Sequence, residues 1–197
     1  MASFHSFFEN NVFVIDEKVR AFRMSNAYRV YNEGGIEIGG IQEVLPWYRA
    51  LLRVFVSKSM LPFSLEILAD DGAKLASIHR GFTFAFSKVT IKDGTGTELA
   101  KINQKFSMLK PKFHLLDPAG NQIGTIQGDW KAWNFQITDK DEQVIGTINK
   151  KWNGALKEVF TTADKYIVSI NPEVAEDTQK VAIVAAAITI DMILKEG

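Results

Sequence analysis

Apolar and polar residues alternate in short segments that repeat along most of the chain. The clearest two copies run from Phe113 to Ile126 and from Phe135 to Ile148, and their internal spacing is the same. Alternation with a period of two predicts half-buried strands. Between the strands stands an Asp-x-x-Gly turn, in which Asp accepts backbone hydrogen bonds and Gly adopts a positive φ. Each copy is therefore predicted to form a β-hairpin.

Further copies of the pattern lie upstream, at 89–102, more loosely at 65–78, and at 28–41. The starts at 65, 89, 113 and 135 are 24, 24 and 22 residues apart. Five hairpins predict about ten strands, and we expect two more from residues 12–24 and another from 166–170. So many consecutive antiparallel strands must close or stack to protect their edges. We favour a closed barrel over a propeller, whose repeats need roughly 40–50 residues each.

Four copies place an aromatic residue four positions after their last isoleucine: Phe82, Phe106, Trp130 and Trp152. We expect these residues to cap the second strand of each hairpin. Trp130, Trp133 and Trp152 are interpreted as barrel core and strand caps in preference to a ligand cage.

The segment at 178–195 is apolar on all sides and follows a candidate N-cap, Asp177. Its apolar part, 181–194, would form a helix about 21 Å long, whereas a bilayer core is about 30 Å thick. We therefore expect a helix buried in the barrel, with a membrane-inserted helix as the alternative. Its predicted core residues are Val181, Ile183, Val184, Ile188 and Asp191. A buried Asp191 needs a cation or a hydrogen-bond donor as partner, which we expect near one barrel mouth.

Composition narrows the function classes. Lys plus Arg and Asp plus Glu number 23 each, and this balance argues against bulk nucleic-acid binding. The absence of cysteine excludes disulfides and thiolate metal sites. The three histidines show no metal-ligand spacing, and no Gly-x-Ser-x-Gly motif occurs. We expect no bond-breaking active site, no cofactor and, without a secretory signal, a cytoplasmic location.

Several short motifs, taken in their order and spacing, resemble the phospholipid scramblase family, whose fold is the tubby C-terminal-like barrel shared with LURP-one-related proteins. The motifs are 28–35, 62–67, 128–130, 148–152, 157–161, 163–166 and 190–192. The resemblance implies one domain over residues 1–197, with about twelve antiparallel strands closed around the C-terminal helix. It also implies membrane lipid as the partner.

Eukaryotic members of that family carry an acidic, calcium-associated segment before the last strand. In the corresponding stretch of this chain, 162–173, only Asp164 and Glu173 are acidic. Calcium takes six to eight oxygen ligands, several of them charged. We therefore expect calcium binding to be weak or absent.

Two regions are candidates for lipid contact. The first is an insertion at 45–58 that mixes apolar, aromatic and basic residues, a composition suited to a membrane interface. Its candidate residues are Trp47, Tyr48, Arg49, Leu51 and Arg53. The second is a basic run that hairpin repeats can gather at one barrel end, where anionic headgroups bind. It comprises Lys101, Lys105, Lys110 and Lys112, with Lys150, Lys151 and Lys157 in the adjacent repeats. The alternatives are a cap on one barrel mouth and ordinary solvated strand ends.

The sequence thus predicts a lipid-associated protein that binds anionic phospholipid membranes peripherally, on the inner face, and assists transbilayer lipid movement. The alternative is a soluble protein-interaction or structural module of the same fold, with a protein partner and no lipid activity.

Overall fold

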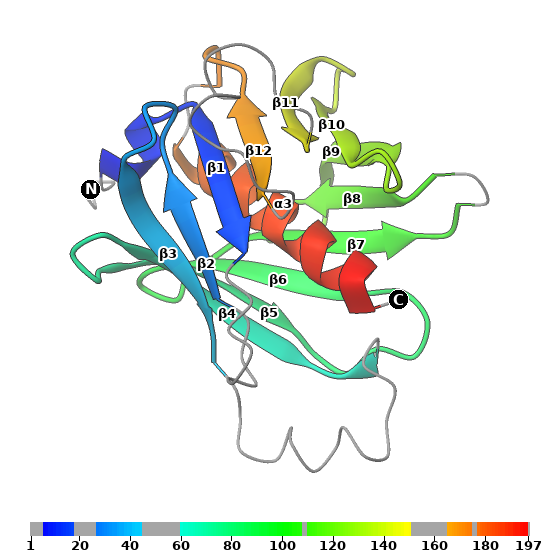
Figure 1. Cartoon of the computed structure of the whole chain (residues 1–197). Coiled ribbons are helices and arrows are strands. Elements are labelled where there is room, and N and C mark those ends of the chain that lie inside the picture. The colour runs from blue at the N-terminus through cyan, green and yellow to red at the C-terminus, as the bar shows by residue number, and fades with distance from the viewer. Residues whose placement is uncertain are drawn as a thin grey trace.

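Twelve antiparallel strands close into a barrel around one long helix (Figure 1). This computed structural model describes residues 6–17, 27–44, 60–107, 110–150, 165–174 and 177–196. In chain order the elements are η1 (Ser6–Glu9), β1 (Val12–Glu17), β2 (Ala27–Tyr31), β3 (Glu37–Glu43), β4 (Phe63–Ala69), β5 (Lys74–Arg80), β6 (Lys88–Asp93), β7 (Glu98–Lys105), β8 (Lys112–Leu116), β9 (Gln122–Asp129), β10 (Asn134–Asp139), β11 (Val144–Asn149), β12 (Lys165–Ile170) and α3 (Asp177–Glu196).

Every strand is paired with its neighbours in the sequence, and β1 closes the ring by pairing with both β12 and β2. Because the ring is closed, none of the twelve strands that the structure describes presents an unpaired edge. The predicted closed barrel of about twelve strands around a C-terminal helix is confirmed. Of the two strands expected within 12–24, one is β1, and residues 18–26 lie outside the described residues.

The five sequence copies are five hairpins with one geometry. In each, the first residue of the copy lies opposite its last isoleucine, and a register shift follows the third residue. The opposed pairs are Tyr28 with Ile41, Leu65 with Ile78, Val89 with Ile102, Phe113 with Ile126, and Phe135 with Ile148. These pairs point inward, so the repeat places a layer of large apolar side chains around the barrel.

The turns of the hairpins share one backbone conformation. Four of them have glycine with positive φ at the eighth position of the copy, namely Gly35, Gly72, Gly96 and Gly120. In the copy that starts at Phe135 the same position is Glu142, with φ of 61°. A side chain there costs free energy, because left-handed backbone brings Cβ close to the following carbonyl oxygen.

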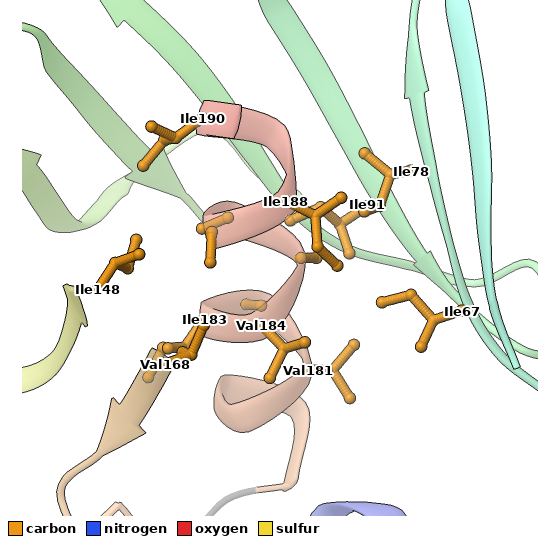
Figure 2. Packing of buried hydrophobic residues seen from close by; sticks show 14 of the residues in the cluster. Ile67, Ile78, Ile91, Ile148, Val168, Val181, Ile183, Val184, Ile188 and Ile190 are labelled. Atoms are coloured by element: carbon orange, nitrogen blue, oxygen red, sulfur yellow. The ribbon is translucent and has the colours of Figure 1, made fainter. Parts of the chain in front are cut away.

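Helix α3 fills the barrel. An eight-stranded barrel is just wide enough for its own side chains, so twelve strands leave space for a further element. Every residue of α3 from Val181 to Met192 is buried. Figure 2 shows isoleucines of the barrel wall and Val168 around the helix. At one close approach of the helix to the wall, β11 carries Gly146. A Cβ added at Gly146 would lie 3.3 Å from Cγ2 of Ile183.

The two ends of the barrel differ. We call one the turn end, because the five hairpin turns lie there, and the other the loop end, because the connections between hairpins lie there. Helix η1 covers the turn end: Phe7 and Phe8 are buried, and Lys180 of α3 donates a hydrogen bond to the carbonyl oxygen of Phe8 over 3.1 Å. Helix α3 runs from there to the loop end, where its C-terminal part lies on the side on which β7 ends (Figure 1).

A buried hydrogen bond joins the last turns of α3 to the wall. The hydroxyl group of Tyr28 on β2 donates to Oδ2 of Asp191 over 3.0 Å, and the Asp191 side chain is fully buried. The sulfur atom of Met192 lies 3.3 Å from the same hydroxyl oxygen. A carboxyl group inside an apolar barrel therefore has a donor from the wall, which fixes the depth of the helix.

Replacing Glu142 by glycine is expected to raise the free energy of unfolding by about 0.5–1 kcal/mol, because relief of the left-handed strain outweighs the greater freedom of glycine in the unfolded chain. Urea unfolding followed by tryptophan fluorescence measures the change. The matched control is Glu142→Ala, which keeps a Cβ at this φ and should gain little. An equal gain from alanine would contradict backbone strain as the cause.

Tyr28→Phe is expected to lower the free energy of unfolding by about 1–3 kcal/mol, because a buried carboxyl group loses a hydrogen-bond donor. Thermal and urea unfolding of Tyr28→Phe, Asp191→Leu and the double variant measure the coupling between the two side chains. The loss caused by Tyr28→Phe should shrink when Asp191 is already leucine. Simple additivity of the two losses would show that the hydrogen bond is not what stabilises the helix.

Candidate functional site

Exposed aromatic side chains gather on the connections at the loop end. Five of them are between 46% and 88% exposed, and Phe84 is the most exposed. We call this set the aromatic rim: Phe82, Phe84, Phe86, Phe106 and Trp130. The rings of Phe86 and Phe106 are in edge-to-face contact, with centroids 6.5 Å apart. Large exposed apolar side chains that occur together mark a binding surface more often than scattered ones do.

The expectation that Trp130 belongs to the barrel core needs correction. Phe82, Phe106 and Trp130 do follow the second strand of their hairpins, but each is exposed. The last isoleucine of a copy is still inside the wall, whereas a residue four positions later lies beyond the strand end. Trp133 does pack on the barrel: it is partly buried and stacks on Tyr166, with ring centroids 5.7 Å apart. Trp152 lies outside the described residues.

Lysine side chains lie next to the aromatic rim. The end of β7 and the start of β8 pair Lys105 directly with Lys112, and Lys110 precedes β8. Within the described part of the chain none of these three forms an ion pair. Like charges directly opposite one another in a sheet are unfavourable, so an anionic ligand would relieve a repulsion that the fold retains. We call Lys105, Lys110 and Lys112 the rim lysines.

The neighbouring His114 reports the positive potential of the rim lysines. It lies on β8, opposite Asn103 of β7 and Thr125 of β9. Partial burial lowers the pKa of His114 below its usual value, and the charges of Lys105 and Lys112 lower it further. Burial and, to a smaller extent, the charges that would attract an anion therefore both favour the neutral imidazole.

A hollow of about 430 Å³ opens between the aromatic rim and the end of α3. Its wall combines apolar and cationic side chains: Phe86, Phe106, Trp130, Ile193 and Leu194 lie beside Lys105 and Lys110. Such a surface suits a ligand that has both a hydrocarbon part and a negative charge. Through Ile193 and Leu194, the helix inside the barrel reaches this surface.

Arg80 supports the connection that carries Phe82, Phe84 and Phe86. Although it ends β5, it is 1% exposed. Its guanidinium group donates a 3.4 Å hydrogen bond to Oγ of Ser87 on that connection and a 2.6 Å hydrogen bond to the carbonyl oxygen of Leu61. It also lies 4.5 Å from the ring centroid of Phe63. We did not identify Arg80 from the sequence. The signal was its position two residues after inward-facing Ile78, where the alternation itself predicts an inward side chain.

The other predicted lipid-contact and metal residues are not part of this hollow. Lys150 follows β11 at the loop end, where its Nζ atom lies 4.5 Å from the ring centroid of Trp133. Glu173 is exposed at the turn end. Several candidates lie outside the described residues: Trp47, Tyr48, Arg49, Leu51, Arg53, Lys151, Lys157 and Asp164. No three acidic or histidine side chains of the described residues come together as metal ligands. Both calcium binding and the role of 45–58 stay predictions.

Comparison with known proteins decides the family. A sequence profile named Scramblase matches residues 13–196. The chain belongs to the scramblase family. This confirms the resemblance that the motifs indicated.

Two relatives and one solved structure show how similar the chain is to known proteins in sequence and in fold. The chain is 25% identical over 194 residues to phospholipid scramblase 2 of Homo sapiens, covering 91% of this chain and 64% of that protein. It is 23% identical over 177 residues to altered inheritance rate of mitochondria protein 25 of Saccharomyces cerevisiae, covering 77% and 54%. An X-ray structure of a protein from Arabidopsis thaliana matches with a TM-score of 0.54 at 7% identity, with 91% of each chain covered.

The matches cover only part of each of these two relatives. The chain spans between about half and two thirds of the length of these two relatives. At 7% identity the solved structure supports the tubby C-terminal-like fold and nothing about activity. No helix among the described residues combines the length and the apolar character needed to cross a bilayer.

Lowering the pH from about 7.5 to about 5.5 is expected to destabilise the protein through His114. Its folded-state pKa is below its unfolded-state value, so the unfolded chain binds more protons in this window and stability falls as pH falls. Thermal unfolding across the window measures the slope.

His114→Gln should flatten this slope, while His79→Gln is the matched control on an exposed strand position. An unchanged slope in His114→Gln would show that His114 is not the cause of the pH dependence of stability. Anionic lipid at the rim should raise the pKa of His114, which histidine NMR titration detects.

Proposed function

We propose that this scramblase-family protein binds the surface of anionic phospholipid membranes through its loop end. The observation that carries the proposal is the aromatic rim, exposed around lysines that have no ion-pair partner among the described residues. Aromatic side chains favour the membrane interface, and lysines favour the negative surface of the cytoplasmic leaflet.

The free energies expected from the aromatic rim and the rim lysines are large enough for reversible membrane binding. Full burial of a large apolar side chain contributes about 1.5–3 kcal/mol, and each lysine near an anionic surface contributes about 1 kcal/mol. Partial insertion of the most exposed rings, such as Phe84 and Phe106, together with the rim lysines therefore suffices for peripheral attachment. The lysine contribution should weaken as salt is raised, since exposed charges are screened.

Charge at the opposite end of the barrel supports one orientation. The hairpin turns carry acidic side chains, including Asp71, Asp93, Asp117 and Asp141. Burial tends to raise the pKa of Asp93, but hydrogen bonds from Thr95 and the turn backbone outweigh it and lower the pKa. A hydrogen bond from Asn121 lowers the pKa of Asp117. The turn end thus stays negative, and an anionic bilayer attracts the loop end while it repels the turn end.

We extend the proposal to assistance of transbilayer lipid movement on the cytoplasmic face. Family membership and the relative named phospholipid scramblase 2 support this extension. Helix α3 occupies the barrel interior, so lipid would move outside the barrel, at a bilayer disturbed by the rim, and not through the protein.

The second candidate function is a protein-interaction module. An exposed aromatic surface with lysines also suits an acidic protein partner. The two functions differ in their response to lipid composition, because only the membrane function requires vesicles.

Co-flotation with phosphatidylcholine vesicles, with and without phosphatidylserine, tests the proposal. We expect binding that requires phosphatidylserine and weakens with salt. Phe84→Ala should reduce partitioning about tenfold, since loss of one buried ring is worth roughly 1.4 kcal/mol or more. Simultaneous Lys105→Gln, Lys110→Gln and Lys112→Gln should reduce it on the order of 100-fold.

Matched controls come from the turn end. Ile36 is an exposed apolar residue there, and Lys140 is an exposed cation beside Asp141. Ile36→Ala and Lys140→Gln should leave flotation unchanged. Absence of binding to any vesicle, or equal losses at both ends, would overturn the proposed membrane face and favour the interaction module.

A further inference from the structure

Lys110 lines two hollows whose walls differ in composition. The first is the apolar and cationic hollow between the aromatic rim and α3. The second, of about 500 Å³, lies over the outer face of β9 and β10 and also includes Lys110 in its wall. Its remaining lining is Thr125, Gln127, Gly128, Asp129, Asn134, Gln136 and Thr138. A cation at the boundary between an apolar hollow and a polar one matches the layout of a phospholipid, in which a phosphate joins hydrocarbon to a polar headgroup.

The apolar side chains of the first hollow suit contact with a lipid acyl chain. Phe106 and Trp130 provide exposed rings, and Ile193 and Leu194 provide an aliphatic floor from α3. Its volume lies within the range of small-ligand pockets, which is about 300–1,000 Å³. Because it is open to the surface, it can take part of a chain whose remainder stays in the bilayer.

The second hollow has the chemistry for a headgroup with hydrogen-bonding groups. Its amide and hydroxyl side chains, such as Gln127, Gln136 and Thr138, both donate and accept. Asp129 adds a carboxylate whose Oδ1 atom accepts the backbone N–H groups of Lys131 at 2.8 Å and Ala132 at 3.2 Å, which fixes its position. A carboxylate there attracts an ammonium group and repels additional phosphate.

We propose that the two hollows together bind one glycerophospholipid molecule whose headgroup carries an amine, with the phosphate at Lys110. The proposal rests on the proposed membrane function and assigns a lipid-selecting site to its surface. Lys110 takes the phosphate because it lines both hollows, whereas Lys105 lines only the first. The acyl part contacts Phe106 and the end of α3, and the headgroup contacts Asp129 and Gln136.

The test uses the full chain and soluble lipid, so that membrane attachment is not required. Dihexanoyl phosphatidylserine below its critical micelle concentration is titrated by calorimetry and by two-dimensional amide NMR. Dihexanoyl phosphatidic acid, which has no amine, and inorganic phosphate are the comparison ligands. We expect saturable binding of the serine lipid, at least about fivefold weaker binding of phosphatidic acid, and still weaker binding of phosphate. Amide chemical shifts should change for residues that line each of the two hollows.

Variants separate the parts of the site. Lys110→Gln and Phe106→Ala should each lower the affinity for the serine lipid at least about fivefold. Gln136→Ala should reduce the preference of the protein for the serine lipid over phosphatidic acid. Phe84 is exposed but lines neither hollow. Phe84→Ala should therefore weaken vesicle flotation and leave soluble-lipid affinity unchanged. Lys92→Gln, on an exposed position of β6, is the charge control and should have no effect on soluble-lipid affinity.

The failures of the two proposals are distinguishable. Vesicle binding without soluble-lipid binding would overturn the site and leave the membrane face in place. Equal affinity for phosphate and for the serine lipid would reduce the site to a general anion site and overturn the proposal. Soluble-lipid binding that survives both Lys110→Gln and Phe106→Ala would place the lipid elsewhere and also overturn it.

Discussion

The space inside a ring of twelve strands must be filled, and the apolar helix α3 fills it. Side chains alone suffice for a barrel of about eight strands, so a wider ring without its helix would enclose a void and lose the contacts that stabilise both. This requirement explains why α3 is buried on all faces and why Gly146 stands in the wall beside Ile183. It also explains why Asp191 has a hydrogen-bond donor from Tyr28, since a carboxyl group at that depth has no access to water.

A filled barrel directs function to its ends. All the strands in the described ranges are paired and helix α3 occupies the interior, so binding surfaces must form where the wall stops. The turn end is made of short, nearly identical turns and is covered by Phe7 and Phe8 of η1. The connections at the loop end vary in length and sequence, and there the chain carries exposed rings such as Phe84 beside Lys105 and Lys110. The two ends therefore differ in charge, in apolar exposure and in proposed role.

The repeated pattern was sufficient to predict the hairpins, but it failed at positions where a residue's surroundings come from distant parts of the chain. Phe113 and Ile126 could be paired because both belong to one copy. The same pattern misled for Trp130, whose place in the copy is regular but lies past the end of the wall. Phe7 and Phe8 carry no periodic signal, and their burial depends on η1 contacting α3, which is far away in the sequence. Lys101 belongs to the basic run of the sequence, yet it pairs with Glu98 toward the turn end.

The sequence by itself determined the strands, the turns, the closed barrel and the burial of the C-terminal helix, because these depend on alternation, on turn residues and on the apolar surface that a segment must hide. Only the tertiary structure decided that Lys105 faces Lys112 and that Lys110 lines two hollows. Those relations join residues of different hairpins and of α3. They are set by the closure of the ring and the depth of the helix within it, and no local pattern encodes either quantity.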